Sequence, residues 1–263
     1  MKILAIGAHP DDIEIFMFGF LCSCKQKGYK ISTVIATDGS LGGSNDDNKL
    51  IENRKKESKD GLNKLGIPLF LNLPDGSLGN ENIHTNIVKN SIQKVTPDLI
   101  VTHYYKDYHS DHINLSKIVK NVAGHYSPIL YCDTMMGINF LPNYYVDITK
   151  FMNDKINSIS CHKTQKPERF INLAKLMNSY RSAQCNAPEG RYAEAYFFEP
   201  SFPFSDIRKI LPESSLKPGL KGLPVSLLIL LKDSSIKPKQ KESSVWLLRQ
   251  SIFLTEGPFS NSQ

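Results

Sequence analysis

Two short clusters of histidine and aspartate residues lie far apart in the sequence. The first cluster contains His9, Asp11 and Asp12, and the second contains His109, Asp111 and His112. A catalytic zinc site uses three protein ligands and leaves one position for water. His9 and Asp12 would supply two ligands from one turn, and a histidine of the second cluster would supply the third. The pattern therefore predicts one metal site that is divided between two segments.

The other polar residues of the two clusters suit a hydrolytic reaction. Water bound to such a metal has its pKa lowered towards ~7, and a general base must lie within hydrogen-bond reach of that water. Asp11, beside the ligand Asp12, is the candidate base. Whichever of His109 and His112 does not bind the metal is suited to stabilise an oxyanion or to protonate a leaving amine. Asp111 is available to orient one of these imidazoles.

Each cluster taken alone also has a simpler structural interpretation. A pair of aspartates after a strand often caps a helix, and Asp12 stands directly before the apolar Ile13. A single histidine is more often a surface or core residue than a metal ligand. The position of the clusters favours the metal site, because each one follows an expected strand.

Short apolar segments alternate with segments of helical periodicity over most of the chain. The expected strands are residues 2–6, 31–37, 69–73, 99–102, 129–132, 144–148 and 192–198, and the expected helices are residues 13–27, 50–65, 82–95, 113–123, 150–161 and 170–181. This alternation predicts an α/β fold with a mostly parallel sheet and helices on both of its faces. Because α/β proteins bind ligands beyond the carboxyl ends of their strands, both clusters are expected at that edge.

The composition is that of a globular protein and changes near the C-terminus. Hydrophobic residues make up 40% of the chain and charged residues 22%. The net charge is +6, but seven basic and only three acidic residues follow Ser214, so the preceding part is nearly neutral. We therefore expect one domain over residues 1–200 and a basic tail rich in Pro, Ser and Lys over residues 201–263. Nucleic acid is not an expected partner.

Targeting signals are not evident in the sequence. The N-terminus leads directly into an expected strand rather than into the apolar region of a signal peptide, and no window reaches the 18 or more apolar residues of a transmembrane helix. The five cysteines are odd in number and scattered, which is typical of free thiols in a reducing compartment. These features predict a cytoplasmic protein without a transmembrane segment.

The two clusters lie within motifs that resemble the signatures of the PIG-L/LmbE-like family of zinc-dependent N-deacetylases: His9-Pro10-Asp11-Asp12 and His109-Ser110-Asp111-His112. Further segments resemble markers of that family, namely residues 37–39, 53–57, 65–66, 73–76, 146–148, 162–165 and 192–194. The resemblance covers residues 1–200. It implies a Rossmann-like fold and an enzyme that removes acetyl from N-acetylglucosamine units of larger molecules.

The resemblance also implies roles for individual residues. It assigns zinc binding to His9, Asp12 and His112. Asp11 is then the general base, and His109, with Asp111 behind it, stabilises the oxyanion or acts as an acid. Arg54 would contact the sugar. Asp38, at an expected strand end, would contact substrate or simply form a turn.

Two positions depart from the family pattern. Ile13 stands where many relatives have glutamate directly after the second aspartate, and Ser110 stands where many have proline. Neither position is an expected ligand, so the predicted zinc site is unaffected. Zinc is the expected cofactor, although two histidines and an aspartate also accept other divalent transition metals.

The sequence thus favours a metal-dependent hydrolase that removes the N-acetyl group from an N-acetylglucosamine-type sugar or its conjugate. Its expected partner is this small-molecule substrate, and a homo-oligomer is compatible with the sequence. One alternative is an amidase that cleaves a larger acyl group from an amino-sugar conjugate. Another is a nucleotide-binding Rossmann protein that uses the loop of residues 38–44, although this loop lacks Gly-x-Gly-x-x-Gly and a Walker lysine.

Overall fold

The computed structural model describes residues 1–43, 49–79, 82–207 and 211. Its strands are β1 (Lys2–Gly7), β2 (Lys30–Thr37), β3 (Leu69–Leu73), β4 (Leu99–Thr102), β5 (Ile129–Cys132), β6 (Tyr144–Asp147) and β7 (Ala193–Phe198). Its α-helices are α1 (Asp12–Phe16), α2 (Phe18–Gln26), α3 (Leu50–Gly61), α4 (Asn82–Val95), α5 (Ser110–Ala123), α6 (Met152–Ile159) and α7 (Pro167–Gln184). Three short 3₁₀ helices complete the set: η1 (Met135–Gly137), η2 (Thr149–Phe151) and η3 (Lys163–Gln165).

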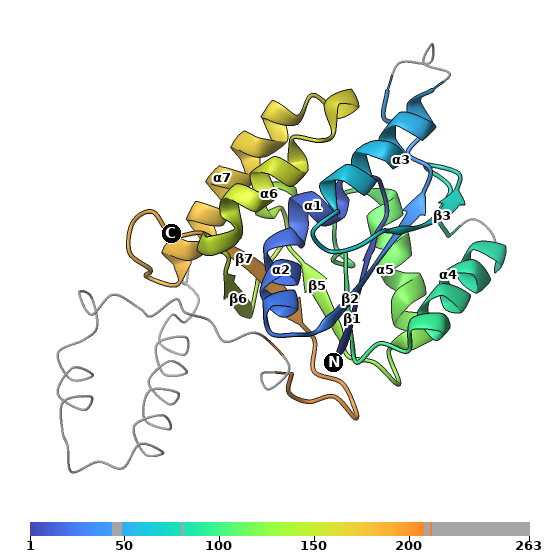
Figure 1. The fold of residues 1–263 in the computed structure, drawn as a ribbon. Coiled ribbons are helices and arrows are strands. Elements are labelled where there is room, and N and C mark those ends of the chain that lie inside the picture. The colour runs from blue at the N-terminus through green and yellow to red at the C-terminus, as the bar shows by residue number, and fades with distance from the viewer. Residues whose placement is uncertain (44–48, 80–81, 208–210, 212–263) are drawn as a thin grey trace, which may run out of the picture. The chain divides into compact units, whose positions relative to one another are not determined.

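The strands form a seven-stranded sheet in the order β3-β2-β1-β4-β5-β7-β6 (Figure 1). Strands β3, β2, β1, β4 and β5 are parallel, whereas β7 runs antiparallel to both β5 and β6. The predicted mostly parallel α/β fold is therefore confirmed. The chain builds outward from β1 to β3 and then returns to place β4 on the other side of β1. This reversal is the point where open α/β sheets bind ligands.

Helices cover both faces of the sheet, as the sequence predicted. One buried apolar cluster joins the sheet to α1, α2, α6 and α7, and a second joins the opposite face to α4 and α5. Figure 1 shows α4 and α5 on the other side of the sheet from α1 and α2. The central strands β1 and β4 are buried along nearly their whole length, which explains their continuous apolar sequences.

Five of the six expected helices differ in extent from the sequence prediction. Helix α6 is shorter than the expected residues 150–161, and α7 extends three residues beyond the expected 170–181 at each end. The helix expected over residues 13–27 is divided at Met17, whose φ of −131° separates α1 from α2. The helix expected over residues 50–65 ends at Gly61, and the residues that follow form turns. Helix α5 begins at Ser110, earlier than expected, so the second His/Asp cluster lies in its first turn.

The division of the chain at residue 200 stays a prediction, because most of residues 201–263 lie outside the described part of the structure. Among the residues that are described, no helix combines the length and the apolar character that crossing a membrane would need.

Candidate active site

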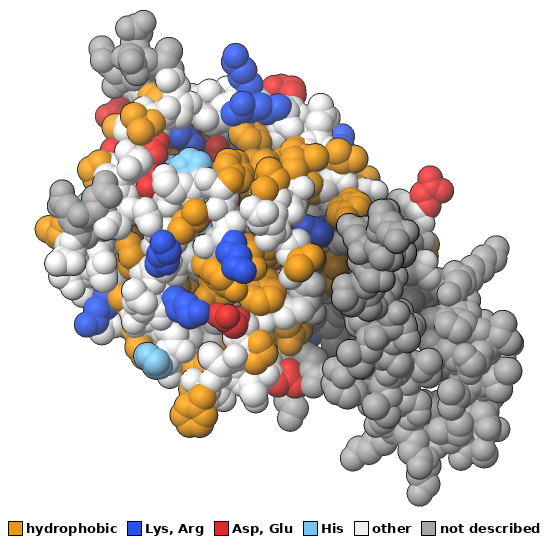
Figure 2. Space-filling model, turned by 180° about the vertical axis from the view of Figure 1, so that it is seen from behind, with side chains coloured by type: hydrophobic (Ala, Val, Ile, Leu, Met, Phe, Trp, Pro, Cys, Tyr) orange, Lys and Arg blue, Asp and Glu red, His pale blue; other side chains and the backbone are white. Residues whose placement is uncertain are grey.

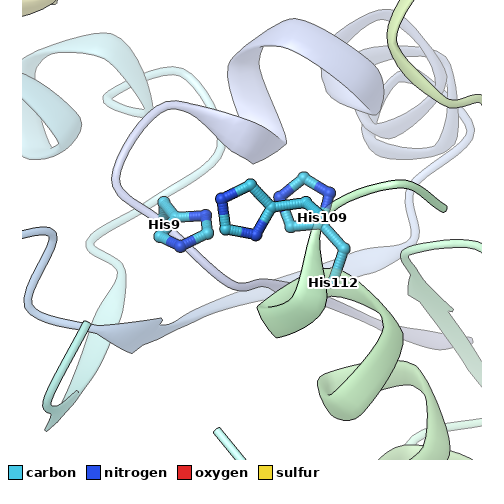
Figure 3. A group of neighbouring side chains, drawn as sticks. All are labelled: His9, His109 and His112. Carbon is cyan, nitrogen blue, oxygen red and sulfur yellow. The ribbon is translucent and has the colours of Figure 1, made fainter. Parts of the chain in front are cut away.

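The two His/Asp clusters meet at the carboxyl edge of the sheet. The turn after β1 carries His9, and the beginning of α5 carries His109 and His112; Figure 3 shows the three imidazoles turned toward one another. The ring centroid of His9 lies 4.7 Å from that of His109 and 5.3 Å from that of His112. A nitrogen from each of the three rings lies within 4.8 Å of the other two. The predicted convergence of the clusters is therefore observed.

The carboxylate of Asp12 lies between two imidazoles. Its Oδ2 is 3.4 Å from Nδ1 of His9, and its Oδ1 is 3.3 Å from Nε2 of His112. All three residues are buried. Asp12 is thus in contact with both of the histidines expected to bind the metal with it. Among the described residues, the groups whose donor atoms all lie within 4.8 Å of one another are His9 with His109 and His112, Asp12 with His103 and His112, and His9 with Asp75 and Asp111.

Both of these histidines have a carboxylate at the ring nitrogen that faces away from Asp12. Nε2 of His9 lies 3.1 Å from Asp75 Oδ1 and 3.3 Å from Asp111 Oδ2. Nδ1 of His112 lies 3.0 Å from Asp107 Oδ2. Such carboxylates orient metal-binding imidazoles and fix their tautomers. The donor set and its supporting carboxylates therefore fit a divalent transition-metal ion.

These carboxylates also dominate the proton affinity of the two rings. Burial works against a charged His9, but hydrogen bonds to Asp111, Asp12 and Asp75 raise its pKa to about 12. Burial likewise opposes protonation of His112, while the charge of Asp12 and the hydrogen bond to Asp107 raise its pKa to about 9. Without a metal the site thus holds protons where a cation would otherwise bind.

Asp11, the predicted base, has an unusual backbone and a shifted pKa. Its φ of 126° lies in a region that residues other than glycine rarely adopt. Burial raises the pKa of its carboxyl group to about 6, although the charge of Arg54 acts in the opposite direction. Asp11 occupies the N-cap position of α1 but makes no capping hydrogen bond. The simpler interpretation of the aspartate pair as a helix cap is therefore not supported.

The side chain of Arg54 is buried and holds the turn that contains Asp11. It donates hydrogen bonds to the carbonyl oxygens of Gly39 (2.8 Å) and Pro10 (2.7 Å) and to Asp11 Oδ2 (3.2 Å). A Cβ atom at Gly39 would lie 2.7 Å from this guanidinium group, so a larger residue there would displace it. Arg54 also lines the cavity described below, and its contact with a sugar stays a prediction.

Asp38 has the structural role that was the alternative to substrate contact. Its Oδ1 accepts hydrogen bonds from the backbone amides of Ser40 (3.0 Å) and Asp75 (3.2 Å). It thereby ties the loop after β2 to the loop after β3. Asp38 is absent from the described residues that line the cavity, so the structure does not bring it to the site.

His109 is held as a neutral ring with a defined tautomer. Its Nδ1 accepts a hydrogen bond from the backbone amide of Asp111 in the first turn of α5 (3.3 Å). Burial and the neighbouring charges of His112 and His9 lower its pKa. A neutral ring whose Nδ1 is an acceptor carries its proton on Nε2. His109 can therefore donate a hydrogen bond from Nε2.

Asp111 differs in its partner from the expectation. The resemblance places it behind His109, but its carboxylate faces His9 instead and accepts hydrogen bonds from the backbone amides of Gly76 (2.8 Å) and Leu78 (3.1 Å). Asp111 lies in the first turn of α5, and the amides whose hydrogen bonds it accepts belong to the loop after β3.

A cavity of about 670 Å³ opens above these residues. Its polar wall comes from the two clusters without Asp111 and from Arg54, Asp75 and Gln165, and its apolar wall comes from Ile15, Phe16, Leu41, Met135, Phe170 and Leu173. Tyr108 and Arg169 also line it. The volume is in the range of small-molecule sites.

Sequence reasoning did not single out three residues that contact the site: Asp75, His103 and Asp107. Asp75 follows β3 and His103 follows β4, so their positions at strand ends were an available signal. Asp107 lies five positions before its partner His112 in an irregular loop, and no local pattern predicts that contact.

Comparison with known proteins agrees with the motifs. Residues 4–123 match the model of the PIG-L family, which is described as GlcNAc-PI de-N-acetylase. The uncharacterized deacetylase YaiS of Escherichia coli (strain K12) is 28% identical over 178 residues, which cover 62% of this chain and 90% of YaiS. Diacetylchitobiose deacetylase of Thermococcus kodakarensis is 25% identical over 199 residues, which cover 64% of this chain and 71% of that protein.

The fold is shared more widely than the sequence. The crystal structure of GalB, the 4-carboxy-2-hydroxymuconate hydratase of Pseudomonas putida KT2440, superposes with a TM-score of 0.67 at 19% identity. The match covers 76% of this chain and 97% of GalB. At this identity the similarity concerns the fold alone, and fold does not determine reaction. Residues 4–123 of this chain thus match the PIG-L family of deacetylases, and the two deacetylase relatives and the motifs agree with that match.

Proposed function

We propose that this protein is a zinc-dependent N-deacetylase that removes the acetyl group from an N-acetylglucosamine-type sugar or its conjugate and releases acetate. The observation that carries the proposal is the arrangement of Asp11 and His109 beside the donor set of His9, Asp12 and His112. A base, a hydrogen-bond donor and a set of metal ligands thus share one cavity.

His9, Asp12 and His112 would hold the zinc ion. When bound, zinc would supply a Lewis acid that polarises the acetyl carbonyl and lowers the pKa of water. All three residues line the cavity, so a bound ion would be accessible to substrate there. Asp75, Asp111 and Asp107 keep the two imidazoles oriented from behind.

Asp11 is suited to move the proton. A carboxylate with a pKa of about 6 is ionised at neutral pH, yet it is a stronger base than an exposed aspartate. It takes the proton from the attacking water and afterwards returns it to the sugar nitrogen, because the C–N bond breaks only when the amine leaves protonated. Arg54 keeps the carboxylate in place through its contact with Oδ2.

His109 is suited to stabilise the oxyanion. Its Nδ1 is occupied by the amide of Asp111, so the proton on Nε2 is available to the carbonyl oxygen as negative charge develops there. A donor of this kind contributes roughly 10²–10³ to kcat in other hydrolases. The lowered pKa of His109 favours this role over that of a general acid.

Acetate release from a panel of N-acetylglucosamine conjugates tests the proposal. The zinc-loaded protein is expected to release acetate from at least one member, and Asp11→Asn to lower kcat by about 10²–10⁴ while still binding zinc. Asp154→Asn is the matched control, because that carboxylate lies at the surface in an ion pair with Lys64. No acetate from any conjugate, or equal activity of Asp11→Asn, would contradict the proposal.

The same panel addresses the amidase alternative. Matched conjugates that carry acetyl or longer acyl groups on the sugar nitrogen separate the two reactions by their kcat/KM values. We expect acetyl to be preferred, since Asp11, Asp12 and the histidines crowd the floor of the cavity. A preference for the longer acyl groups would favour the alternative.

A further inference from the structure

Gln165 lines the active-site cavity with a side-chain amide whose orientation is fixed by its neighbours. Its Nε2 donates hydrogen bonds to the carbonyl oxygen of Gly42 at 2.9 Å and to Thr164 Oγ1 at 3.2 Å. A carbonyl oxygen accepts only from the nitrogen of an amide, so this contact decides which of the two terminal atoms is Oε1. Both protons of Nε2 are thus used within the protein.

The Oε1 atom of Gln165 remains available as a hydrogen-bond acceptor. No donor within the described part of the chain bonds to it, although only 8% of the residue is exposed. Oε1 is also not among the fully enclosed polar atoms that lack a partner, so it retains contact with the open space that the residue lines. A largely buried acceptor at a cavity wall is suited to bind a donor group of a ligand.

Gly42 allows this oxygen to approach the guanidinium group of Arg54. A Cβ atom at Gly42 would overlap with Nη1 of Arg54 and would lie 3.3 Å from Oε1 of Gln165. The two polar groups therefore converge on one side of Gly42, in space that any side chain there would fill. All three residues line the cavity. A donor and an acceptor thus lie close together on its wall, an arrangement that suits neighbouring hydroxyl groups of a sugar.

One helix positions both of these groups. Glu57 on α3 accepts hydrogen bonds from the backbone amide of Thr164 at 2.9 Å and from its hydroxyl at 2.7 Å. The residue next to Gln165 is therefore held by both oxygens of one carboxylate. Arg54 lies one turn before Glu57 on the same helix. Such pre-organisation lowers the entropic cost of ordering the side chains when a ligand binds.

We propose that Gln165 is a specificity-determining residue whose Oε1 accepts a hydrogen bond from one hydroxyl of the N-acetylglucosamine unit. The inference rests on the proposed function and deepens it, because it requires a sugar with that hydroxyl rather than any N-acetylated amine. The two terminal atoms of the side chain then have separate tasks: Nε2 holds the loop at Gly42, and Oε1 recognises the substrate.

A substitution combined with a change in the sugar separates these two tasks. Gln165→Met keeps the length of the side chain but has neither Nε2 nor Oε1. The probes are the methyl glycoside of N-acetylglucosamine and its 3-, 4- and 6-deoxy analogues, each of which lacks one hydroxyl. Their dissociation constants are measured by calorimetry on zinc-loaded Asp11→Asn protein, in which turnover is slowed. Gln93→Met is the matched control, because Gln93 is exposed on α4 and is absent from the described residues that line the cavity.

We expect one of the three deoxy analogues to bind roughly 5- to 50-fold more weakly than the parent sugar when Gln165 is present. Gln165→Met should reduce that ratio to less than about twofold and leave the ratios of the other two analogues unchanged. Gln93→Met should leave every ratio unchanged. A role confined to holding Gly42 would weaken the binding of all the sugars by the same factor, and unchanged ratios in Gln165→Met would overturn the inference.

A second variant covers the case in which circular dichroism shows that Gln165→Met does not fold. Gln165→Asn keeps an amide but withdraws it by one methylene group, so it should lower the same ratio. An unchanged ratio in this variant would also overturn the inference.

The failure of this inference is distinguishable from failure of the proposed function. Binding that depends on one hydroxyl through Gln165, without acetate release from any conjugate, would refute the deacetylase and leave the role of Gln165 intact. Acetate release with ratios that do not respond to Gln165→Met would do the reverse. Failure of all the sugars to bind would overturn the role of Gln165.

Discussion

At the scale of single residues, the site concentrates strain and buried charge on Asp11. A φ of 126° at a residue with a side chain is unfavourable, and so is an ionised carboxylate away from water. Arg54 offsets both, because it binds the carbonyl oxygen of Pro10 as well as Asp11 Oδ2. The geometry is thus maintained at a cost in stability, as is common where a side chain must be presented to a substrate.

The pH dependence of the reaction follows from the pKa of Asp11. The base must be ionised to accept a proton, and burial raises its pKa to about 6. Values of kcat/KM at constant zinc saturation should therefore fall as the pH drops through about 6, well above the pKa of 3.8 of an unperturbed aspartate. Arg54→Gln should move this acidic limb to higher pH, because the charge of Arg54 lowers the pKa of Asp11. An acidic limb near pH 4 would contradict the assignment of Asp11 as the base.

Asp107 should be important for zinc binding although it is not an expected ligand. Its Oδ2 lies 3.0 Å from Nδ1 of His112, and its Oδ1 accepts the backbone amide of His109. We expect Asp107→Asn to weaken zinc affinity 10- to 100-fold, measured by chelator competition. Asp98→Asn is the control, since Asp98 lies at the surface, where its carboxylate accepts a hydrogen bond from the backbone amide of Lys2. Equal affinities of the two variants would show that Asp107 does not support His112.

At the scale of elements, the sequence predicted the strands more closely than the helix ends. Strands β3, β4 and β5 have the expected bounds, because each is a short, mostly apolar segment bounded at either end by a proline or a polar residue. Helix ends depend on partners distant in sequence. The break at Met17 is one such case, since the amides of Gly19 and Phe20 donate to Glu194 on β7, and no local pattern encodes that contact.

In the site, too, some contacts could be predicted from the sequence, and others depend on segments that are distant in sequence. The convergence of His9 with His112 follows from two strands that are neighbours in the sheet, and alternation of strands and helices is enough to predict it. The partner of Asp111 and the approach of Asp75 to His9 depend on how the loop after β3 folds over the site. That loop conformation is set by tertiary contacts, so the sequence alone did not predict it.

Glu194 should be the most sensitive ionisable residue outside the site. Its carboxylate forms a buried ion pair with Lys155 at 2.7 Å, caps the first amides of α2 and accepts the hydroxyl of Tyr196. Glu194→Gln would leave the charge of Lys155 buried and unpaired, which typically costs 3–5 kcal/mol. Urea unfolding followed by circular dichroism should show a loss of about this size in the free energy of unfolding.

The surface pair Lys64–Asp154 provides the comparison for this prediction. Its side chains are 55% and 31% exposed, and such pairs contribute about 0–1 kcal/mol. Lys64→Ala should therefore change the free energy of unfolding by at most about a third of the effect of Glu194→Gln. Similar losses in the two variants would mean that burial of the Glu194 pair is not what makes it important.

At the scale of the whole molecule, zinc binding should link distant parts of the chain. The expected ligands come from the turn after β1 and from α5, and carboxylates from the loops after β3 and β4 surround them. These buried carboxylates repel one another. In the absence of metal, protons on His9 and His112 offset the repulsion, as their raised pKa values indicate. A divalent cation would replace those protons and stabilise the assembled edge of the sheet.

The stability gained from zinc should consequently increase with pH. Zinc must displace the proton from His112, whose pKa is about 9, so its affinity rises as the pH approaches that value from below. A ligand at 100 times its dissociation constant stabilises the folded state by about 2.7 kcal/mol. The increase in Tm on adding zinc to chelator-treated protein should therefore be larger at pH 8 than at pH 6.

Asp12→Asn should remove the increase at both pH values, because it takes a charged ligand from the site without disturbing the core of the sheet. An increase independent of pH, or one that persists in Asp12→Asn, would place the stabilising zinc elsewhere on the protein.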